Sequence, residues 1–182
     1  VPEIFIEGVT NPAGDFYKIS IPGHNPTSIT GKPELPVLSR LISIPENNTV
    51  SIRISEVITE KIIPRNNSFK GLLYPRQESA TKNFQQQERE FLIDRAEYSK
   101  RGLIKSDTVK VEYIGKVRNR QLATLLIYPI RYNPSSNELE VIKSMKVEVA
   151  FTPIKGNNAA PPKANSLLFN QSVERGLLTY SP

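Results

Sequence analysis

One stretch of the sequence has prolines near both of its ends and reads Gly31-Lys32-Pro33-Glu34-Leu35-Pro36-Val37-Leu38-Ser39-Arg40-Leu41-Ile42-Ser43-Ile44-Pro45. Because proline keeps the residue before it extended, the apolar run from Leu35 to Ile44 is predicted to be a strand. A turn at residues 47–49 leads into residues 50–57, where apolar and polar side chains alternate. This period of two is typical of a strand with one buried face. We expect the two segments to pair as a hairpin.

Further strands are predicted on both sides of this hairpin. Residues 1–22 contain two short strands around a turn, and the later strands are predicted at 108–113, 121–128, 138–142 and 144–151. Helical composition is limited to residues 83–101, where Asn83 is a possible cap and Gly102 a possible end. The predicted fold class is all-β: an antiparallel β-sandwich with one short helix or helical turn and an extended C-terminal tail.

The composition shifts after the last predicted strand. Residues 1–152 are assigned to the sandwich, and residues 153–165, rich in Pro, Asn and Ala, are assigned to a linker. Apolar residues return in residues 166–182, which are predicted to form an extended tail. An extended but partly apolar tail is expected to lie along this domain or along a partner.

The residue types exclude several kinds of catalytic site. The chain has no Cys, which rules out a cysteine nucleophile, and its single His, His24, lies in a Gly-Asn-Pro context typical of a turn. One His without Cys does not reach the ligand number of a zinc site, and Asp15, Asp94 and Asp107 are too far apart for a calcium loop. We expect no cofactor, no metal and no enzymatic activity.

The charge pattern argues against a nucleic-acid partner, and the length of the apolar runs argues against a membrane span. The formal net charge is +6, but 24 basic residues are interspersed with 18 acidic ones. The densest basic group, residues 116–120, lacks aromatic neighbours for base stacking and is predicted to be a hairpin turn. No apolar run approaches the length of about 20 residues needed to span a bilayer. We therefore expect neither a nucleic-acid partner nor a membrane span.

Several features occur in an ordered combination. They are Gly31-x-Pro33-x-Leu35-Pro36 followed by Leu38-Ser39-Arg40, the Arg118-x-Arg120 turn before a strand, and Pro129-x-x-Tyr132-Asn133-Pro134 before an alternating strand through Val149. Over residues 28–152 this combination resembles the N-terminal prodomain of gingipain-type cysteine endopeptidases. The resemblance implies an inhibitor and intramolecular chaperone of a cognate cysteine peptidase catalytic domain. It also implies export to the periplasm, the outer membrane surface or the extracellular space.

The resemblance implies a protease-inhibiting loop after the central hairpin. Aligning Lys70-Gly71-Leu72-Leu73-Tyr74-Pro75-Arg76-Gln77-Glu78 with that loop places Arg76 at the anchor position, beside Tyr74 and Pro75. Lys70 and Arg65 are the alternative basic anchors, and a solvated charge on Arg76 is the competing interpretation. Cleavage is expected in the tail from Arg175 through Tyr180 to Pro182.

Two other functions are compatible with a β-sandwich. The first is a carbohydrate-binding module, which needs an aromatic platform; the chain has no Trp, and its seven Tyr are dispersed. The second is an adhesin-like module of a secreted bacterial protein, which only the fold class favours. Glycan binding and inhibition of a gingipain-like peptidase distinguish these hypotheses.

Overall fold

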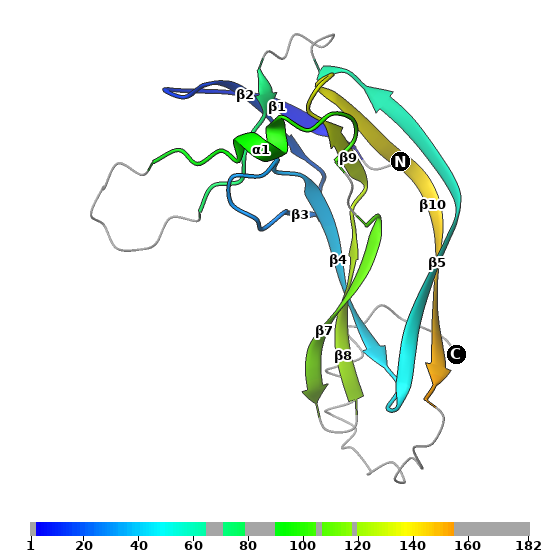
Figure 1. Ribbon diagram of the computed structural model, residues 1–182. Helices are drawn as coiled ribbons and strands as arrows, with labels where there is room; N and C mark the ends of the chain where they lie inside the picture. Colours follow the sequence, from blue (N-terminus) through cyan, green and yellow to red (C-terminus); the bar gives the residue numbers. More distant parts are fainter. Residues whose placement is uncertain (1–2, 65–70, 79–89, 105–106, 118–119, 155–182) are drawn as a thin grey trace. The chain divides into compact units, whose positions relative to one another are not determined.

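The structure is a computed structural model that describes residues 3–64, 71–78, 90–104, 107–117 and 120–154. Its described strands form three sheets with the orders β1-β2-β6, β5-β10-β9 and β3-β4-β8-β7 (Figure 1). The elements are β1 (Phe5–Asn11), β2 (Gly14–Ser20), β3 (Asn25–Pro26), β4 (Pro36–Ile44), β5 (Asn48–Ile62), β6 (Leu72–Leu73), α1 (Arg95–Tyr98), β7 (Val109–Val117), β8 (Arg120–Ile127), β9 (Ile130–Asn133) and β10 (Glu138–Pro153). The predicted all-β sandwich with one short helix is confirmed.

The chain divides into two compact units. Unit 1 contains residues up to Val37, residues 57–106 and residues 128–144, whereas unit 2 contains residues 38–56, residues 107–127 and residues from Met145 onward. Strands β4, β5 and β10 contribute residues to both units. The proposed boundaries of the linker and tail, at 153–165 and 166–182, lie almost wholly outside the described residues and stay predictions.

Unit 1 is built around buried side chains from strands of two sheets. Along β2 the side chains alternate, so that Tyr17 and Ile19 are buried on one face. They pack with Leu73 of β6 and with residues of β9 and β10, namely Ile130, Tyr132, Leu139 and Val141. Phe16 lies on the opposite face of β2 and contacts other aromatic rings. This packing places one face of β2 in the core of unit 1.

Unit 2 has a separate core. The strand β8 contributes Ala123 and Leu125, β4 contributes Ile42 and Ile44, and β7 contributes Val109. Partly buried side chains of β5 and β10 pack against them: Val50, Ile52, Met145, Val147, Val149 and Phe151. The alternation predicted for residues 144–151 therefore places one apolar face of β10 on this core.

The predicted hairpin between the segments 36–44 and 50–57 is wrong. Strand β4 pairs antiparallel with β8, from Leu38 opposite Ile127 to Ile44 opposite Gln121, and β5 is hydrogen-bonded to β10 instead. Strands β4 and β5 belong to different sheets, and apolar residues of both pack against the core of unit 2, as in a sandwich. Asn47, with a φ of 58°, lies in the short connection between them.

The helix is a single turn at the end of the region where helical composition was noted. In α1 the side chain of Asp94 accepts a hydrogen bond from the backbone N–H of Glu97, which satisfies a free donor at the helix start. The cap is therefore Asp94, and Asn83 lies outside the described residues. Within the part of the chain that the structure describes, no helix is long and apolar enough to cross a membrane.

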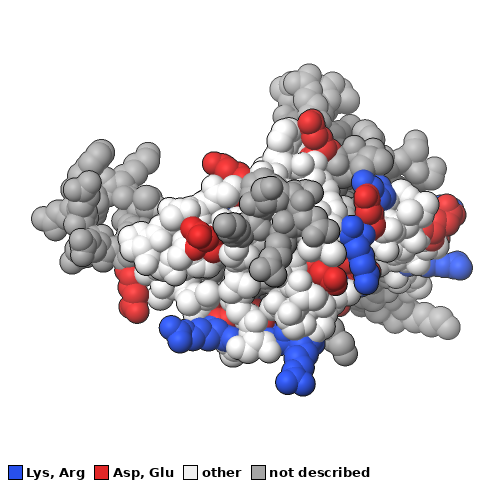
Figure 2. All heavy atoms as spheres, turned by 90° about the horizontal axis from the view of Figure 1, so that it is seen from above, with Lys and Arg blue, Asp and Glu red and all other residues white. Residues whose placement is uncertain are grey.

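Acidic and basic side chains lie intermixed on the face shown in Figure 2. Several acidic and basic side chains of the described residues form ion pairs: Lys116 pairs with Glu46, Lys143 with Glu60, Lys110 with Glu112 and Lys146 with Glu148. Exposed pairs of this kind contribute little to stability, about 0–1 kcal/mol each.

Candidate functional site

The segment aligned with the inhibitory loop is described from Gly71 to Glu78 and belongs to unit 1. Gly71 has a φ of +88°, and a Cβ there would lie 1.7 Å from the carbonyl oxygen of Asp15. Only glycine allows the backbone to approach β2 so closely. Directly after Gly71, β6 pairs in parallel with β2, placing Leu72 opposite Phe16 and Leu73 opposite Tyr17. The start of the segment is therefore fixed to the central strand.

Asn137, in the connection between β9 and β10, also binds the start of the segment at Gly71. Its side-chain oxygen accepts hydrogen bonds from the hydroxyls of Tyr17 and Tyr132, each at 2.9 Å. Its side-chain nitrogen donates to the carbonyl oxygen of Gly71, also at 2.9 Å. The hydroxyl of Tyr98 donates to the carbonyl oxygen of Leu73 at 2.6 Å. These bonds join the β9–β10 turn, α1 and the segment through partly buried polar groups.

The tyrosine hydroxyls stay protonated at neutral pH. Burial raises the pKa of Tyr17 and of Tyr98 far above the ordinary value, and the neighbouring Tyr132 adds to both shifts. Burial also raises the pKa of Tyr132 to about 12. Because ionised oxygens would be poorly solvated here, all three groups act as neutral hydrogen-bond donors.

Tyr74 and Pro75 continue the segment in an ordered conformation. The ring of Tyr74 contacts Phe16 and Phe91, with ring centroids 5.8 and 5.6 Å apart, and the ammonium of Lys18 lies 4.3 Å from the Tyr74 ring centroid. Pro75 is buried and forms an isolated antiparallel bridge with Pro33. Neither residue is free to reorient without breaking packing contacts.

Arg76 is held by both its side chain and its backbone. Its guanidinium Nη1 lies 3.0 Å from Oε2 of Glu34, and the two side chains are 27% and 16% exposed. Its backbone N–H donates to the carbonyl oxygen of Lys32 at 2.8 Å, and its carbonyl oxygen accepts from the N–H of Gly31 at 2.7 Å. The predicted anchor is thus half-buried and already paired with a carboxylate.

Gln77 joins this segment to the chain that returns toward α1. Its side-chain oxygen accepts from the N–H of Leu92 at 3.0 Å, and its side-chain nitrogen donates to the Leu92 carbonyl oxygen at 2.8 Å. The N–H of Asp94 donates to the carbonyl oxygen of Gly31 at 2.9 Å. We call residues 31–34, 74–77 and 92–94, which are linked by these bonds, the three-segment base.

A sequence model of the C25 propeptide family, Propeptide_C25, matches residues 2–181. The chain belongs to the C25 propeptide family. This assignment confirms that the chain is a non-catalytic prodomain of the gingipain type. Its ordered three-segment base is therefore a feature of a propeptide domain.

Curated relatives of this C25 propeptide come from Porphyromonas gingivalis. Lys-gingipain and Lys-gingipain W83 are each 31% identical over 149 residues, which is 82% of this chain. That stretch is 9% of Lys-gingipain and 8% of Lys-gingipain W83, so the chain spans a small part of these relatives.

Two solved structures from the same organism are similar to this propeptide. A structure addressing the zymogenic latency of gingipain K has a TM-score of 0.74 and 28% identity, covering 83% of this chain and 82% of that one. A complex of RgpB pro- and mature domains has a TM-score of 0.75 and 15% identity, covering 99% and 89%, and this likeness shows the fold alone.

The predicted site residues are only partly placed by the structure. Tyr74, Pro75 and Arg76 lie together in the three-segment base, whereas Lys70, Arg65, Arg175, Tyr180 and Pro182 lie outside the described residues. The sequence pattern does not reveal that Glu34 and Asn137 bind the segment, or that Gln77 within it pairs with Leu92. Glu34 lies in the quoted proline-rich stretch, but its contact with Arg76 spans 42 positions, which no local pattern reveals.

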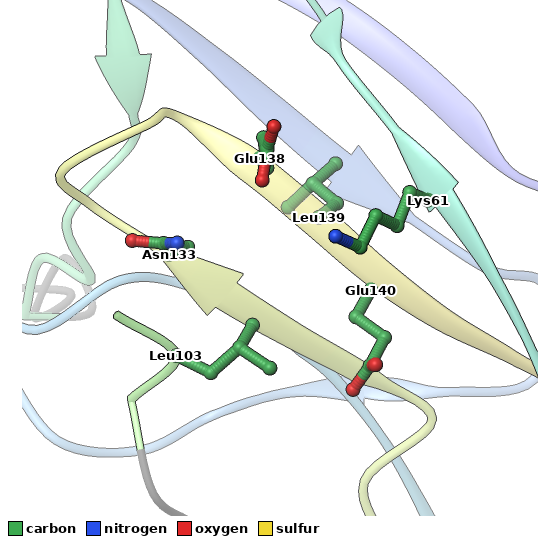
Figure 3. Close-up of a pocket in the computed structure, with 6 residues that line it drawn as sticks. All are labelled: Lys61, Leu103, Asn133, Glu138, Leu139 and Glu140. Carbon is green, nitrogen blue, oxygen red and sulfur yellow. The ribbon is translucent and has the colours of Figure 1, made fainter.

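The remaining features of the described residues do not add a catalytic or metal site. His24 forms a turn, in which its N–H donates to the carbonyl oxygen of Ile21. Among the described residues no group of His, Cys, Asp and Glu could hold a metal ion. A pocket of about 190 Å³ is lined by Lys61, Leu103, Asn133, Glu138, Leu139 and Glu140, and Figure 3 shows Lys61 extending from β5 toward Leu139 and Glu140 of β10. Ligand pockets are usually larger, at about 300–1,000 Å³.

Proposed function

We propose that this domain blocks the active-site cleft of a gingipain-type cysteine peptidase catalytic domain until proteolysis removes it. The family match over residues 2–181 carries this proposal. It is supported by the similarity to the gingipain K structure, whose subject is zymogenic latency. The three-segment base adds a physical reason, because a segment ordered before binding loses less conformational entropy when it enters a cleft.

Within this proposal Arg76 is the basic side chain that enters an acidic specificity pocket. Its guanidinium is paired with Glu34 in the free domain, so binding exchanges one carboxylate partner for another. A bidentate pair with a buried carboxylate provides both energy and orientation. The Arg76 side chain is 27% exposed, so a carboxylate of the peptidase can approach the guanidinium before its pair with Glu34 breaks. Lys70 and Arg65 are the alternative anchors.

The experiment measures inhibition of the cognate catalytic domain by the separately purified prodomain. Arg76→Ala is expected to raise the inhibition constant by more than about tenfold, because a charged anchor at the centre of an interface is lost. Arg65→Ala and Lys70→Ala are measured in parallel. Lys110→Ala is the matched control, since Lys110 is an exposed cation of unit 2 paired with Glu112. Competition with a covalent active-site ligand tests whether the cleft itself is occupied.

The inhibition constants test separately which basic residue is the anchor and whether the domain blocks the cleft. An inhibition constant for Arg76→Ala within about twofold of wild type, with a large increase for Lys70→Ala or Arg65→Ala, moves the anchor to that residue. Absence of inhibition by the wild-type domain contradicts the cleft-blocking role itself. Glycan binding in that case favours the carbohydrate-binding alternative.

We also propose that the domain assists the folding of its catalytic domain and that both are exported from the cell. An intramolecular chaperone raises the refolding yield of the catalytic domain when it is added in trans. Equal yields with and without the prodomain contradict this role. Removal is proposed to occur in the region of Arg175, Tyr180 and Pro182, and N-terminal sequencing of the processed peptidase locates the cut.

A further inference from the structure

The peptide bond between Arg76 and Gln77 follows a basic residue, which is the position that a peptidase with a basic preference hydrolyses. Hydrolysis would add water across this bond, leaving a carboxylate on Arg76 and an amine on Gln77. We infer that Gln77 is a positioning residue that keeps this bond from being cut, so that the segment acts as an inhibitor and not as a substrate. This inference rests on the proposed function, because it assigns Gln77 a role in the proposed inhibitory segment.

The backbone of Arg76 is already engaged on both sides. A peptidase binds its substrate as an extended strand through main-chain hydrogen bonds, as in other strand-addition complexes. At Arg76 the N–H donates to Lys32 and the carbonyl oxygen accepts from Gly31, at 2.8 and 2.7 Å. These two groups must leave their partners before the Arg76 carbonyl carbon fits a hydrolytic site.

The side chain of Gln77 restricts the residue on the leaving side of that bond. Its amide forms two hydrogen bonds with the backbone of Leu92, at 2.8 and 3.0 Å, in the way that a peptide group pairs with a neighbouring strand. Its nitrogen also approaches the carbonyl oxygens of Pro75 and Arg76, at 3.0 and 3.3 Å. The Arg76 carbonyl group therefore has contacts from Gly31 and from Gln77.

The neighbouring residues make local opening costly. Pro75 is buried and bridged to Pro33, while Glu34 donates its backbone N–H to Tyr74 at 2.9 Å. Cleavage of a folded segment follows the population of its locally open form when opening is fast. Removing the Gln77 amide deletes the bonds to Leu92 while leaving those between Arg76 and residues 31–32 in place. The change acts on the opening equilibrium of this segment more than on the core of unit 1.

Limited digestion of the whole 182-residue chain with trypsin tests this inference under single-cut conditions. The readout is the initial cleavage rate at Arg76 divided by the rate at Arg101, an exposed residue outside helices and strands. Each product is measured by mass spectrometry. The variants are Gln77→Ala and Gln77→Glu, and Glu at this position removes the donor and places a carboxylate near the carbonyl oxygens. Gln121→Ala in β8 is the matched control.

The wild-type chain is expected to be cut much more slowly at Arg76 than at Arg101. Both Gln77 variants are expected to raise the Arg76 to Arg101 ratio by about tenfold or more, which is the effect of losing one to two net hydrogen bonds. An unchanged ratio, an equal rise in Gln121→Ala, or rapid wild-type cleavage at Arg76 overturns the inference. Because trypsin replaces the cognate peptidase, this result is independent of whether the domain inhibits that enzyme.

Discussion

The guanidinium of Arg76 lies 3.0 Å from the carboxylate of Glu34, although 42 positions separate the two residues in the chain. Both side chains are mostly shielded from solvent, so this pair is screened less than the surface pairs of the same domain. The contact links the segment proposed to inhibit a peptidase with the proline-rich stretch from Gly31 to Pro45. Glu34 therefore competes with the carboxylate of any acidic pocket for the guanidinium of Arg76.

Glu34→Gln is expected to lower the inhibition constant by about threefold to tenfold, because a neutral amide competes less strongly for the guanidinium. Inhibition of the cognate catalytic domain at two ionic strengths provides the measurement. Glu112→Gln, which removes the partner of the exposed Lys110, is the control. A higher inhibition constant for Glu34→Gln would show that the ion pair is needed to hold the segment in its binding conformation.

Gly71→Ala is expected to destabilise the domain by more than about 4 kcal/mol. The new Cβ would meet the Asp15 carbonyl oxygen at 1.7 Å, so β2 and the segment must separate. Gly102→Ala is a matched control, because Gly102 also has a positive φ, +83°, but nothing lies within 4 Å of its Cβ position. The control should lose only about 1–2 kcal/mol of conformational strain. Urea unfolding of both variants checks the difference, and equal losses would contradict the close approach.

Asn137→Ala is expected to cost about 2–4 kcal/mol, since the hydroxyls of Tyr17 and Tyr132 and the carbonyl of Gly71 lose a partner. Asn137 has a φ of 53°, so Ala also adds backbone strain. Asn137→Gly removes the same hydrogen bonds without that strain and isolates the polar contribution. If Asn137→Gly unfolds at the same urea concentration as wild type, the polar contribution is negligible.

Alkaline pH is expected to unfold the domain through its buried tyrosines. Tyr132 has a pKa of about 12 in the folded chain against an ordinary value of 10, and the pKa values of Tyr17 and Tyr98 are raised further. The folded state therefore holds these protons more tightly, and the stability is fully present below pH 10 and falls as the pH rises toward 12. Unfolding free energies measured at pH 8, 10 and 11 by urea titration check this direction. Tyr98→Phe, which retains a ring but no ionisable group, should show a smaller decline above pH 10.

The fold class could be predicted from the sequence because strand periodicity and turn residues are local signals. The alternation in residues 144–151 corresponds to the C-terminal part of β10, and the Pro129-x-x-Tyr132-Asn133-Pro134 feature spans β9 and the start of the β9–β10 connection. The partner of β4 could not be predicted, because an apolar strand shows which face is buried but not which strand lies beside it. The error of pairing residues 36–44 with residues 50–57 follows from that limit.

The candidate site was predictable only in part. Arg76 is predicted through the family resemblance and its basic charge, whereas the contacts that restrain it come from Glu34, Lys32 and Gly31. Gln77 is an ordinary polar residue in the sequence, and its role depends on a backbone brought close by tertiary folding. The role of Asn137 depends on nearby Tyr132 and on two residues far away in the chain, Tyr17 at 120 positions and Gly71 at 66 positions.

The bond from Tyr17 to Asn137 spans 120 positions, which has a consequence during synthesis on the ribosome. The hydroxyl of Tyr17 has no Asn137 to pair with until most of this chain has been translated. Contacts between such distant residues slow folding, because a long loop must close before they form. The N-terminal strands are therefore expected to remain incompletely assembled until the β9–β10 hairpin has left the exit tunnel.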